Sequence, residues 1–506
     1  MSDNLFTVMR EHFPEDASRE FLRVPQGRVV SYADMQAESA RFANAITALG
    51  VRPGDRVAVQ VDKSPEALML YLGTLRAGAV FLPLNTAYTA AEVSYFLGDA
   101  EPALAVCRPE DADTLSDVAR EAGVGRLETL GADGQGSLMA HFQAADARFE
   151  DVEREADDLA AILYTSGTTG RSKGAMLTHR NLASNAQALV ETWRFTAQDR
   201  LLHALPIFHT HGLFTASNTI LMAGASMIFL PRFDVEQVID LLPEATTMMG
   251  VPTFYFRLLQ NERFTQECVS HIRLFISGSA PLSPDVHAAF EKRTGHAILE
   301  RYGMTETGMN TSNPYDGARR AGTVGFPLPG VEIRIADPET GQILKDGEIG
   351  VIEIRGPNVF KGYWRMPEKT AEEFRPDGFF ISGDLGFIDD QGYLNIVGRD
   401  KDLIISGGFN VYPAEVEAAI DEIPAVAESA VIGVPHPDFG EAVTAVVARA
   451  PGAELEEEEV LEKLSGQLAR FKQPKKVFFV EALPRNAMGK IQKKDLREAY
   501  KDTFAS

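Results

Sequence analysis

The sequence predicts an α/β protein with two domains. A large N-terminal domain, residues 1–400, is expected to contain parallel sheets layered with helices and a small β-barrel-like region at about residues 322–398. A small α+β C-terminal domain is expected over residues 401–506. Three observations support this prediction. The chain has 506 residues, which is too long for one core; apolar strand-like segments alternate with helix-like segments; and short β segments with glycine-rich turns follow Gly322.

In the N-terminal part, the alternation begins at Asp55. Arg56–Val61 and Val80–Leu84 have the apolar pattern of buried strands, and Ser64–Ala77 between them is expected to be a helix. Ser64 can cap the first turn of this helix, and Pro65 suits its first position. The other expected strands are Leu159–Leu163, Leu201–Leu205, Ser226–Leu230, Thr247–Val251, Leu274–Ser277 and Ile298–Tyr302, with helices at Val235–Leu242 and Pro284–Thr294. Such alternation predicts parallel sheets that bind ligands at the carboxyl ends of their strands.

After Gly322 the pattern changes. Four short segments fit a small barrel or sheet: Val331–Ile335, Ile349–Arg355, Phe379–Ile381 and Tyr393–Val397. A third region begins near Arg399, with a helix start at Pro413 and an acidic helix at Glu456–Leu464. From Phe471 to Lys501, nine Lys or Arg residues face three acids, a net charge of +6. A basic run of this kind is usually a solvated face, and here it can also meet a phosphorylated ligand.

Composition excludes several functional classes. The net charge is -23, from 72 acidic and 49 basic residues, so nucleic acid and anionic membranes are not expected partners. Only Cys107 and Cys268 are present, without CxxC spacing, which argues against a disulfide framework or a structural zinc site. The N-terminus is polar and Ile220–Leu230 is too short to span a bilayer. We therefore expect a cytoplasmic protein.

The most informative motif is Tyr164-Thr-Ser-Gly-Thr-Thr-Gly-Arg-Ser-Lys-Gly174, which follows an apolar strand. Its glycines let backbone N–H groups approach an anion, its hydroxyls add donors, and its two cations balance phosphate charge. It does not fit the P-loop pattern, because Ser172 stands where that pattern requires glycine. The motif predicts a nucleotide-phosphate loop of another class, and an ordinary polar turn is the alternative.

Other polar signals follow predicted strands. His209, Ser277–Ala280 and Tyr302–Thr307 each come just after one. His209 and His211 form only an H-x-H, which is too little for a metal site.

Five motifs occur in the order found in acyl-adenylate-forming enzymes. They are Tyr164–Gly174, Tyr302-Gly-Met-Thr-Glu306, Ser382-Gly-Asp384, Gly398-Arg-Asp-Lys-Asp402 and Pro484-Arg-Asn-Ala-Met-Gly-Lys490. The chain resembles this family, which includes acyl-CoA synthetases, peptide-synthetase adenylation domains and luciferases, over nearly its whole length. The resemblance implies that a carboxylate attacks the α-phosphate of ATP, pyrophosphate leaves, and a thiol then displaces AMP from the acyl-AMP.

The resemblance also implies the residues that bind ATP. Those expected at the phosphates are Thr165, Ser166, Gly167, Thr168, Thr169, Lys173 and Thr305. Ser279, Ala280, Pro281 and Glu300–Tyr302 are expected to frame adenine, with Tyr302 stacking on the base, and Gly303 and Met304 are also expected to bind ATP. Asp384 and Arg399 resemble the ribose-binding pair, with a mutual surface salt bridge as the alternative. Glu306 is expected to help place Mg²⁺, since it supplies a hard oxygen donor. The alternatives are that Glu306 caps a helix and that Thr305 supports the turn.

The C-terminal motifs imply a division of labour. Lys490 resembles the lysine that neutralises charge during adenylation. Lys401 matches a hinge about which the small domain turns, which brings Ser406-Gly407-Gly408 to the tunnel for the pantetheine arm of coenzyme A. The loop around Lys490 also resembles those on which a lysine acetyltransferase and deacetylase act.

Arg301 discriminates between substrates. In the family, the residue before Tyr302 lies beside the acyl pocket, and an arginine there implies a dicarboxylic acid. The segment from Glu300 to Gly317 resembles malonyl-CoA synthetases, with His209 and Ser277 at the carboxylate and Met304 on the pocket wall. In the alternative, Arg301 points outward to Glu300 or Asp316. Methylmalonate, another short acid, carrier-protein loading, a luciferase-like oxygenase and a non-catalytic ATP-binding module remain alternative functions.

Overall fold

The computed structural model describes residues 2–165, 172–406, 409–437, 439–465, 467–468, 470–486 and 489–504, leaving out the side chains of Phe409 and Asn410. The chain forms two compact units. The first comprises Met1–Glu332 and Ile354–Phe380, and the second Ile333–Glu353 and Ile381–Ser506. The predicted α/β class is confirmed. The domain boundary at residue 400 and the hinge at Lys401 stay predictions.

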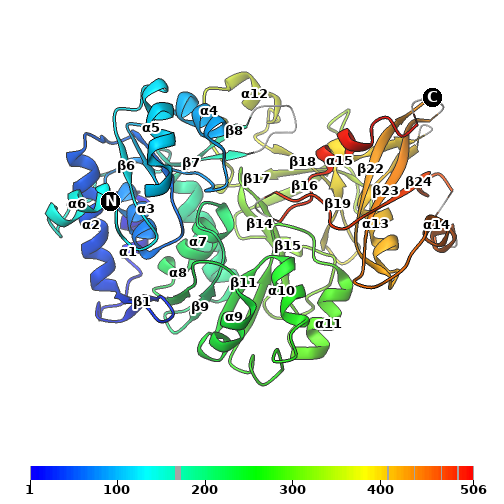
Figure 1. Ribbon diagram of the computed structural model, residues 1–506, viewed down its shortest axis with the longest axis horizontal. Helices are drawn as coiled ribbons and strands as arrows, with labels where there is room; N and C mark the ends of the chain where they lie inside the picture. The colour runs from blue at the N-terminus through cyan, green and yellow to red at the C-terminus, as the bar shows by residue number, and fades with distance from the viewer. Residues whose placement is uncertain are drawn as a thin grey trace. The chain divides into compact units, whose positions relative to one another are not determined.

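The first unit contains a nine-stranded sheet, drawn in green and blue in the lower part of Figure 1. Its order is β15-β14-β13-β12-β11-β9-β10-β1-β2. The strands are β1 (Glu20–Arg23), β2 (Val29–Ser31), β9 (Arg200–His203), β10 (Ser226–Phe229), β11 (Thr247–Gly250), β12 (Leu274–Ser277), β13 (Leu299–Met304), β14 (Gly308–Ser312) and β15 (Phe326–Pro327). The strands from β1 to β13 in this order are parallel, as predicted, whereas β2, β14 and β15 pair antiparallel at the edges.

One face of this sheet is covered by helices. They are α9 (Val235–Leu241), α10 (Pro252–Leu259) and α11 (Pro284–Thr294), with the short turn η3 (Leu242–Glu244). Their apolar side chains pack with those of the central strands into one core, in which Phe275 of β12 meets Phe290 of α11. The helices predicted at Val235–Leu242 and Pro284–Thr294 are confirmed.

A second sheet in this unit has six strands in the order β6-β5-β3-β4-β7-β8. They are β3 (Arg56–Gln60), β4 (Val80–Pro83), β5 (Leu104–Cys107), β6 (Leu127–Thr129), β7 (Leu159–Thr165) and β8 (Lys173–Thr178), packed with α4 (Ala90–Ala100), η1 (Pro109–Asp111) and α5 (Ala112–Glu121). All are parallel except β8, which pairs antiparallel with β7. The predicted phosphate loop therefore connects two strands of one hairpin.

The remaining helices of the unit are α1 (Leu5–Arg10), α2 (Tyr32–Ala48), α3 (Pro65–Arg76), α6 (Ser137–Ala144), α7 (His179–Trp193), the π-helix η2 (His211–Ser217), α8 (Asn218–Met222) and α12 (Pro367–Glu372). Helix α3 is buried along nearly its whole length, as its all-round apolar sequence requires. The Ser64 side chain accepts a hydrogen bond from Ala67 N, so the predicted cap is confirmed. Gly73 permits close packing with α2, since a Cβ there would lie 2.7 Å from that of Phe42.

The β segments after Gly322 form a four-stranded sheet in the order β16-β17-β18-β19. They are β16 (Glu332–Ala336), β17 (Gly350–Arg355), β18 (Phe380–Ile388) and β19 (Leu394–Arg399), and the turn η4 (Asp400–Asp402) follows. The four predicted segments are present and each begins within one residue of its prediction, but β18 continues to Ile388, beyond the predicted end at Ile381.

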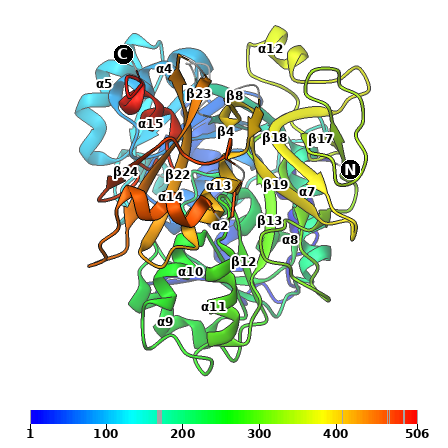
Figure 2. The same cartoon turned by 90° about the vertical axis from the view of Figure 1, so that its right-hand side faces the viewer.

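The C-terminal sheet contains β20 (Ile404–Ser406), β21 (Phe409–Val411), β22 (Val426–His436), β23 (Gly440–Arg449) and β24 (Lys476–Val480). Its helices are α13 (Pro413–Asp421), α14 (Glu457–Ser465) and α15 (Lys493–Tyr500), which Figure 2 shows in orange and red around the sheet. Alternate residues of β22 face opposite sides: Val431 packs with α13 and α14, and Ile432 packs with Leu496 of α15. The predicted α+β character of this region is thus confirmed. None of the described helices in the chain is long and apolar enough to cross a membrane.

Candidate active site

The ends of two neighbouring strands form the centre of the candidate site. β12 and β13 are parallel, with Ser277 opposite Glu300, so the residues after Ser277 lie beside Arg301. β9 of the same sheet ends at His203, and the chain then leads to His209 and η2. The His211 ring meets the loop after β12, since its Nδ1 lies 3.1 Å from Ser279 Oγ. The sheet therefore brings together side chains that are about 100 residues apart in sequence.

Arg301 is a buried cation with unused hydrogen-bonding capacity. The residue is only 4% exposed, and its Nε and Nη2 have no hydrogen-bond partner in the protein. A Cβ on Gly278 would lie 2.3 Å from Arg301 Cζ, so only glycine leaves room for the guanidinium. Burial lowers the pKa of Arg301 to about 9, and the group stays protonated at pH 7. The alternative in which Arg301 points outward is therefore wrong. Asp316, one of the acids considered for it, instead pairs with Arg194.

Two further buried polar atoms at these strand ends, Ser277 Oγ and His211 Nε2, also lack partners. His211 Nε2 belongs to a ring close to Arg301, whereas Ser277 is paired with Glu300 and shares the face of the sheet opposite to Arg301. The pKa of His211 lies well below its ordinary value, first because of burial and then because of the Arg301 charge, so the ring is neutral at pH 7. Buried polar atoms are nearly always hydrogen-bonded in folded proteins. A buried cation and a neighbouring ring nitrogen, both without partners, have the chemistry of a site for an anion.

His209 is half-buried and accepts a hydrogen bond from His211 N at its Nδ1, at 3.4 Å. It lies near His211, whose pKa it helps to lower. Sequence reasoning selected His209 for the acyl pocket and passed over His211. The sequence after β9 does not determine which of the two histidine rings, His209 or His211, is directed toward Arg301.

The phosphate loop is described only at its ends. Ser166, Gly167, Thr168 and Thr169 lie outside the described residues. Thr165 ends β7 opposite Lys173 at the start of β8. The Lys173 ammonium lies 2.9 Å from Glu373 Oε1 and 3.9 Å from the centre of the Tyr363 ring. In this structure, therefore, a carboxylate already compensates the lysine predicted to bind phosphate.

Glu306 belongs to the same group of residues. It is 6% exposed, and the Tyr363 hydroxyl lies 3.1 Å from its Oε1 and 2.7 Å from Glu373 Oε2. Two carboxylates therefore surround one hydroxyl, and the hydroxyl can donate to only one at a time. Glu306 is followed by β14 and caps no helix. Tyr363 and Glu373 were not predicted, because no motif places them near the phosphate loop.

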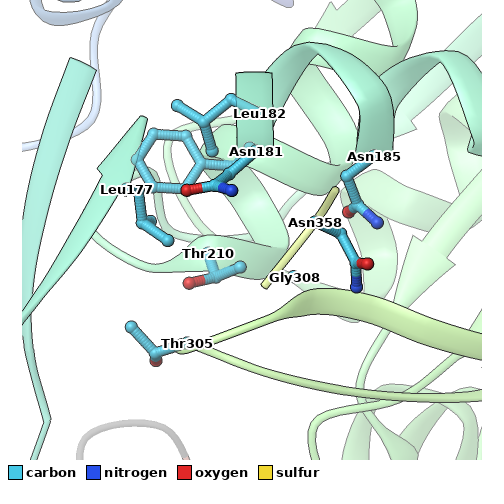
Figure 3. A pocket seen from close by; sticks show the side chains of 9 residues that line it. Leu177, Asn181, Leu182, Asn185, Thr210, Thr305, Gly308 and Asn358 are labelled. Atoms are coloured by element: carbon cyan, nitrogen blue, oxygen red, sulfur yellow. The ribbon is translucent and has the colours of Figure 1, made fainter. Parts of the chain in front are cut away.

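Thr305 faces a small cavity behind the turn between β13 and β14, as Figure 3 shows. The cavity is lined by Leu177, Asn181, Leu182, Asn185, Thr210, Phe214, Thr305, Gly308 and Asn358. Asn185 of α7 accepts a hydrogen bond from Met309 N and donates one to Met309 O. Asn358 donates to Thr307 O. These side chains fix the turn that carries Thr305 and Glu306.

The predicted adenine-binding residues lie along the same strand ends. Ser279 has φ 74°, a strained conformation for serine. Ala280 is half-buried, Pro281 is exposed, and Gly303 and Met304 are half-buried in β13. Tyr302 is 7% exposed. Glu300 is buried and accepts a hydrogen bond from Gly322 N; burial raises its pKa to about 8.

The second unit carries the remaining predicted residues. Asp384 and Arg399 are paired across β18 and β19, with Arg399 Nε 2.9 Å from Asp384 Oδ1. The mutual salt bridge that was the alternative for this pair is thus present in this structure. Lys401 is exposed in η4, and Ser406 ends β20; Gly407 and Gly408 lie outside the described residues.

Lys490 follows a tight turn in the second unit. Its backbone N donates to Asn486 Oδ1 at 2.9 Å, and its carbonyl accepts from Asn486 N at 2.9 Å. Although the residue is exposed, the pKa of Lys490 is lowered, first by loss of water around the ammonium and then by the Arg399 charge. Asp384 acts in the opposite direction.

Most of the cations in the basic run from Phe471 to Lys501 form ion pairs within the protein. Six of its nine cations contact carboxylates: Lys472, Lys476, Arg485, Lys493, Arg497 and Lys501. Among the described residues, Lys475, Lys490 and Lys494 have no such ion pair. The run is therefore largely neutralised within the protein.

Comparisons with known proteins agree with these motifs. The family model described as AMP-binding enzyme matches residues 10–364, and the model of the AMP-binding enzyme C-terminal domain matches residues 415–490. The chain is 37% identical to a malonate–CoA ligase of Arabidopsis thaliana over 486 residues, covering 90% of this chain and 79% of the relative. It is 39% identical to a feruloyl-CoA synthase of Amycolatopsis over 479 residues, covering 94% of each.

Among solved structures, ATP-bound MatB from Rhodopseudomonas palustris has 60% sequence identity and a TM-score of 0.98, with complete coverage of both chains. The chain therefore belongs to the family of AMP-binding enzymes.

Proposed function

We propose that this protein is an ATP-dependent acid–thiol ligase that forms malonyl-CoA from malonate and coenzyme A. In the first step, one carboxylate of malonate attacks the α-phosphorus of ATP, and the bond to pyrophosphate breaks. In the second step, the coenzyme A sulfur attacks the acyl carbon of malonyl-AMP, the thiol proton is lost to solvent, and AMP leaves. Two named malonate–CoA ligases, from Arabidopsis thaliana and the mouse, are each 37% identical to this chain and support the choice of acid.

One observation carries the choice of a diacid: Arg301 is buried with two nitrogens that no protein group satisfies. A fatty or aromatic acid would leave this charge buried without a counter-ion, at a cost of several kcal/mol. A second carboxylate on the substrate supplies the counter-ion. His211 Nε2 adds a neighbouring hydrogen-bonding group. With one carboxylate at Arg301 and the other at the α-phosphate of ATP, a three-carbon acid has the natural length.

ATP is bound, in this proposal, by three groups of residues. The phosphates contact Thr165, Ser166, Gly167, Thr168, Thr169, Lys173 and Thr305. Adenine lies among Ser279, Ala280, Pro281, Glu300 and Tyr302, with Gly303 and Met304 as further ATP contacts. Asp384 and Arg399 bind ribose. To do so, Asp384 must turn part of its hydrogen-bonding capacity from Arg399 to the sugar hydroxyls. Lys173 must likewise exchange Glu373 for a phosphate oxygen.

Mg²⁺ is typical of this family and is expected to accompany the phosphates. Among the described residues, no group of three or more His, Cys, Asp or Glu side chains could hold a metal ion. Mg²⁺ bound with a nucleotide needs only one or two protein carboxylates, because phosphate and water complete its shell. The buried Glu306 carboxylate fits this requirement. Bound Mg²⁺ would neutralise charge on the phosphates.

Lys490 acts in the first step, where its ammonium balances the charge that develops around phosphorus. Lys401 is the hinge, and Ser406, Gly407 and Gly408 line the path of the pantetheine arm in the second step. The exposure of Lys490 in a tight turn also supports the proposal that a lysine acetyltransferase and deacetylase act on it. A cytoplasmic location stays a prediction from the sequence.

A second candidate is the activation of methylmalonate, which has the same two carboxylates. One added methyl group changes binding by only about 1–3 kcal/mol, so the anion site alone does not separate these acids. Loading of a carrier protein is the other alternative, and it shares the adenylation step.

The test is pyrophosphate release with coenzyme A across acetate, malonate, methylmalonate, succinate and ferulate, followed by detection of AMP and the thioester. We expect malonate to have the highest kcat/KM, and thioester formation to depend on coenzyme A. Ferulate is included because a named feruloyl-CoA synthase is 39% identical to this chain. A higher kcat/KM for acetate or ferulate would overturn the proposal.

A further inference from the structure

A half-buried lysine contacts the end of β9, the strand that leads to His209 and His211, and the proposed reaction does not use it. Lys63 follows β3, and its Nζ lies 2.8 Å from His203 Nδ1, 2.8 Å from His203 O and 4.2 Å from the centre of the Phe229 ring. Burial lowers the pKa of Lys63 well below its ordinary value. No ion pair joins it to a carboxylate within the described part of the chain. Among the described residues, its polar contacts are all made with His203.

The contacts of His203 determine which ring nitrogen carries the proton. The ring is fully buried, and burial, followed by the Lys63 charge, lowers its pKa well below the ordinary value, so it is neutral. Its Nε2 lies 2.8 Å from the carbonyl oxygen of Gly212. A carbonyl only accepts hydrogen bonds, so the proton is on Nε2 and Nδ1 is an acceptor. Lys63 is the donor to that Nδ1.

Gly212 is the residue through which His203 reaches the acyl pocket. It lies in the first turn of η2, directly after His211. A Cβ on Gly212 would lie 2.0 Å from Pro206 O, so the chain passes too closely there for any other residue. The Gly212 carbonyl accepts from both His203 Nε2 and Ser217 Oγ. These contacts fix the start of a π-helix, a rare structure that is found mostly at functional sites.

We propose that Lys63 is a positioning residue for the acyl pocket: by donating to His203 it fixes the carbonyl of Gly212 and, through it, the His211 ring beside Arg301. The chain of contacts runs from Lys63 to His203, Gly212 and then the adjacent His211, whose ring meets Ser279. The kinetic effect expected from this inference rests on the proposed use of malonate. The tautomer of His203 does not depend on that use.

The kinetic test compares Lys63→Met with the wild type, since methionine keeps the length of the side chain and removes the donor. We expect the KM for malonate to rise about tenfold, the effect of losing roughly one good hydrogen bond. The KM for ATP should stay within about twofold. Lys63→Arg, which keeps a donor, should restore part of the loss. Lys292→Met, an exposed lysine of α11, is the matched control and should change neither constant.

A double variant separates positioning from general damage. If Lys63 acts through His203, Lys63→Met combined with His203→Leu should be no worse than His203→Leu alone. His203→Gln, which keeps a donor for Gly212, should retain more malonate activity than His203→Leu. Additive losses, an equal rise in the KM for ATP, or an unchanged KM for malonate would overturn the proposal.

A measurement without substrate keeps the inference separate from the proposed function. With ¹⁵N-labelled histidine, the spectrum should show His203 protonated at Nε2 in the wild type. In Lys63→Met, the ¹⁵N chemical shift of His203 Nδ1 should change, and the fold should be retained. If the wild type does not use malonate but these shifts appear, the proposed function fails and the positioning role stands. An Nδ1-protonated His203 in the wild type would refute the positioning role.

Discussion

The two arginines predicted to contact substrates lie in opposite electrostatic situations. Arg301 in the first unit is 4% exposed and has two nitrogens without a protein partner. Arg399 in the second unit has a side chain that is 41% exposed, and it pairs with Asp384 at 2.9 Å. A buried cation without a counter-ion destabilises a fold, whereas a partly exposed guanidinium beside a buried carboxylate has its charge compensated within the protein. The difference indicates that the region around Arg301 is built for an anionic ligand that the protein itself does not supply.

The largest effect is expected from removing the unpaired arginine. Arg301→Ala should weaken kcat/KM for malonate by about 3–5 kcal/mol, the scale of leaving one charge of a buried pair uncompensated. The kcat/KM for acetate should change far less, because acetate has no second carboxylate. Steady-state kinetics with both acids measure this. Arg232→Ala, at an exposed arginine, is the matched control. Equal losses for the two acids would mean that Arg301 supports the fold or the nucleotide site.

The second effect concerns Lys490 in the other unit. Lys490→Ala should slow malonyl-AMP formation by about 10²–10³-fold, as the loss of one electrostatic contact to the reacting group does. It should largely spare the conversion of supplied malonyl-AMP and coenzyme A to thioester. The two half-reactions are measured separately, by pyrophosphate exchange and by thioester formation. Equal loss in both would refute the assignment of Lys490 to the first step alone.

A smaller effect, of opposite sign, is expected on stability. Arg301→Met should stabilise the ligand-free protein by about 1–3 kcal/mol, because it removes an unsatisfied buried charge. Arg399→Met should instead lower stability, since it removes a partner of the buried Asp384 carboxylate. Denaturant unfolding of the two variants measures both values. A destabilised Arg301→Met would show that the guanidinium is part of the scaffold.

The last effect is a pH dependence at the residue before Arg301. Burial raises the pKa of Glu300 to about 8 in the folded protein, above its ordinary value of 4.5. The folded state therefore binds more protons between these values, and stability decreases as pH rises from about 5 to 8. Glu300→Gln keeps the side chain neutral, so its Tm relative to the wild type should increase over this range and level off above pH 8. A constant Tm difference would mean that Glu300 is already ionised.

Sequence reasoning identified the central strands and the helices better than the strands at the edges of the sheets. The helix from Ser64 was predictable because its cap and Pro65 are local signals, and both are present. The antiparallel strands β2, β14 and β15 were missed, because pairing direction depends on distant residues. The π-helix η2 was also missed, since Pro206 and Gly212 must first come together in space.

The site shows the same limit. Arg301 was found because it precedes a recognisable motif, and its burial then agreed with the expected role. His211, Tyr363, Glu373 and Lys63 carry no motif of their own. Their importance arises from contacts across the fold, such as that between Lys173 and Glu373, 200 residues apart.

The most direct test combines the substrate and the arginine in one thermodynamic cycle. kcat/KM is measured for malonate and for monomethyl malonate, which lacks the distal charge, with the wild type and with Arg301→Ala. If the guanidinium pairs with the distal carboxylate, kcat/KM should be much lower for the methyl ester than for malonate with the wild type, and the two substrates should be used about equally by Arg301→Ala. The coupling energy between the arginine and the distal carboxylate should then be about 3 kcal/mol or more. A coupling energy near zero would contradict the pairing on which the choice of malonate depends.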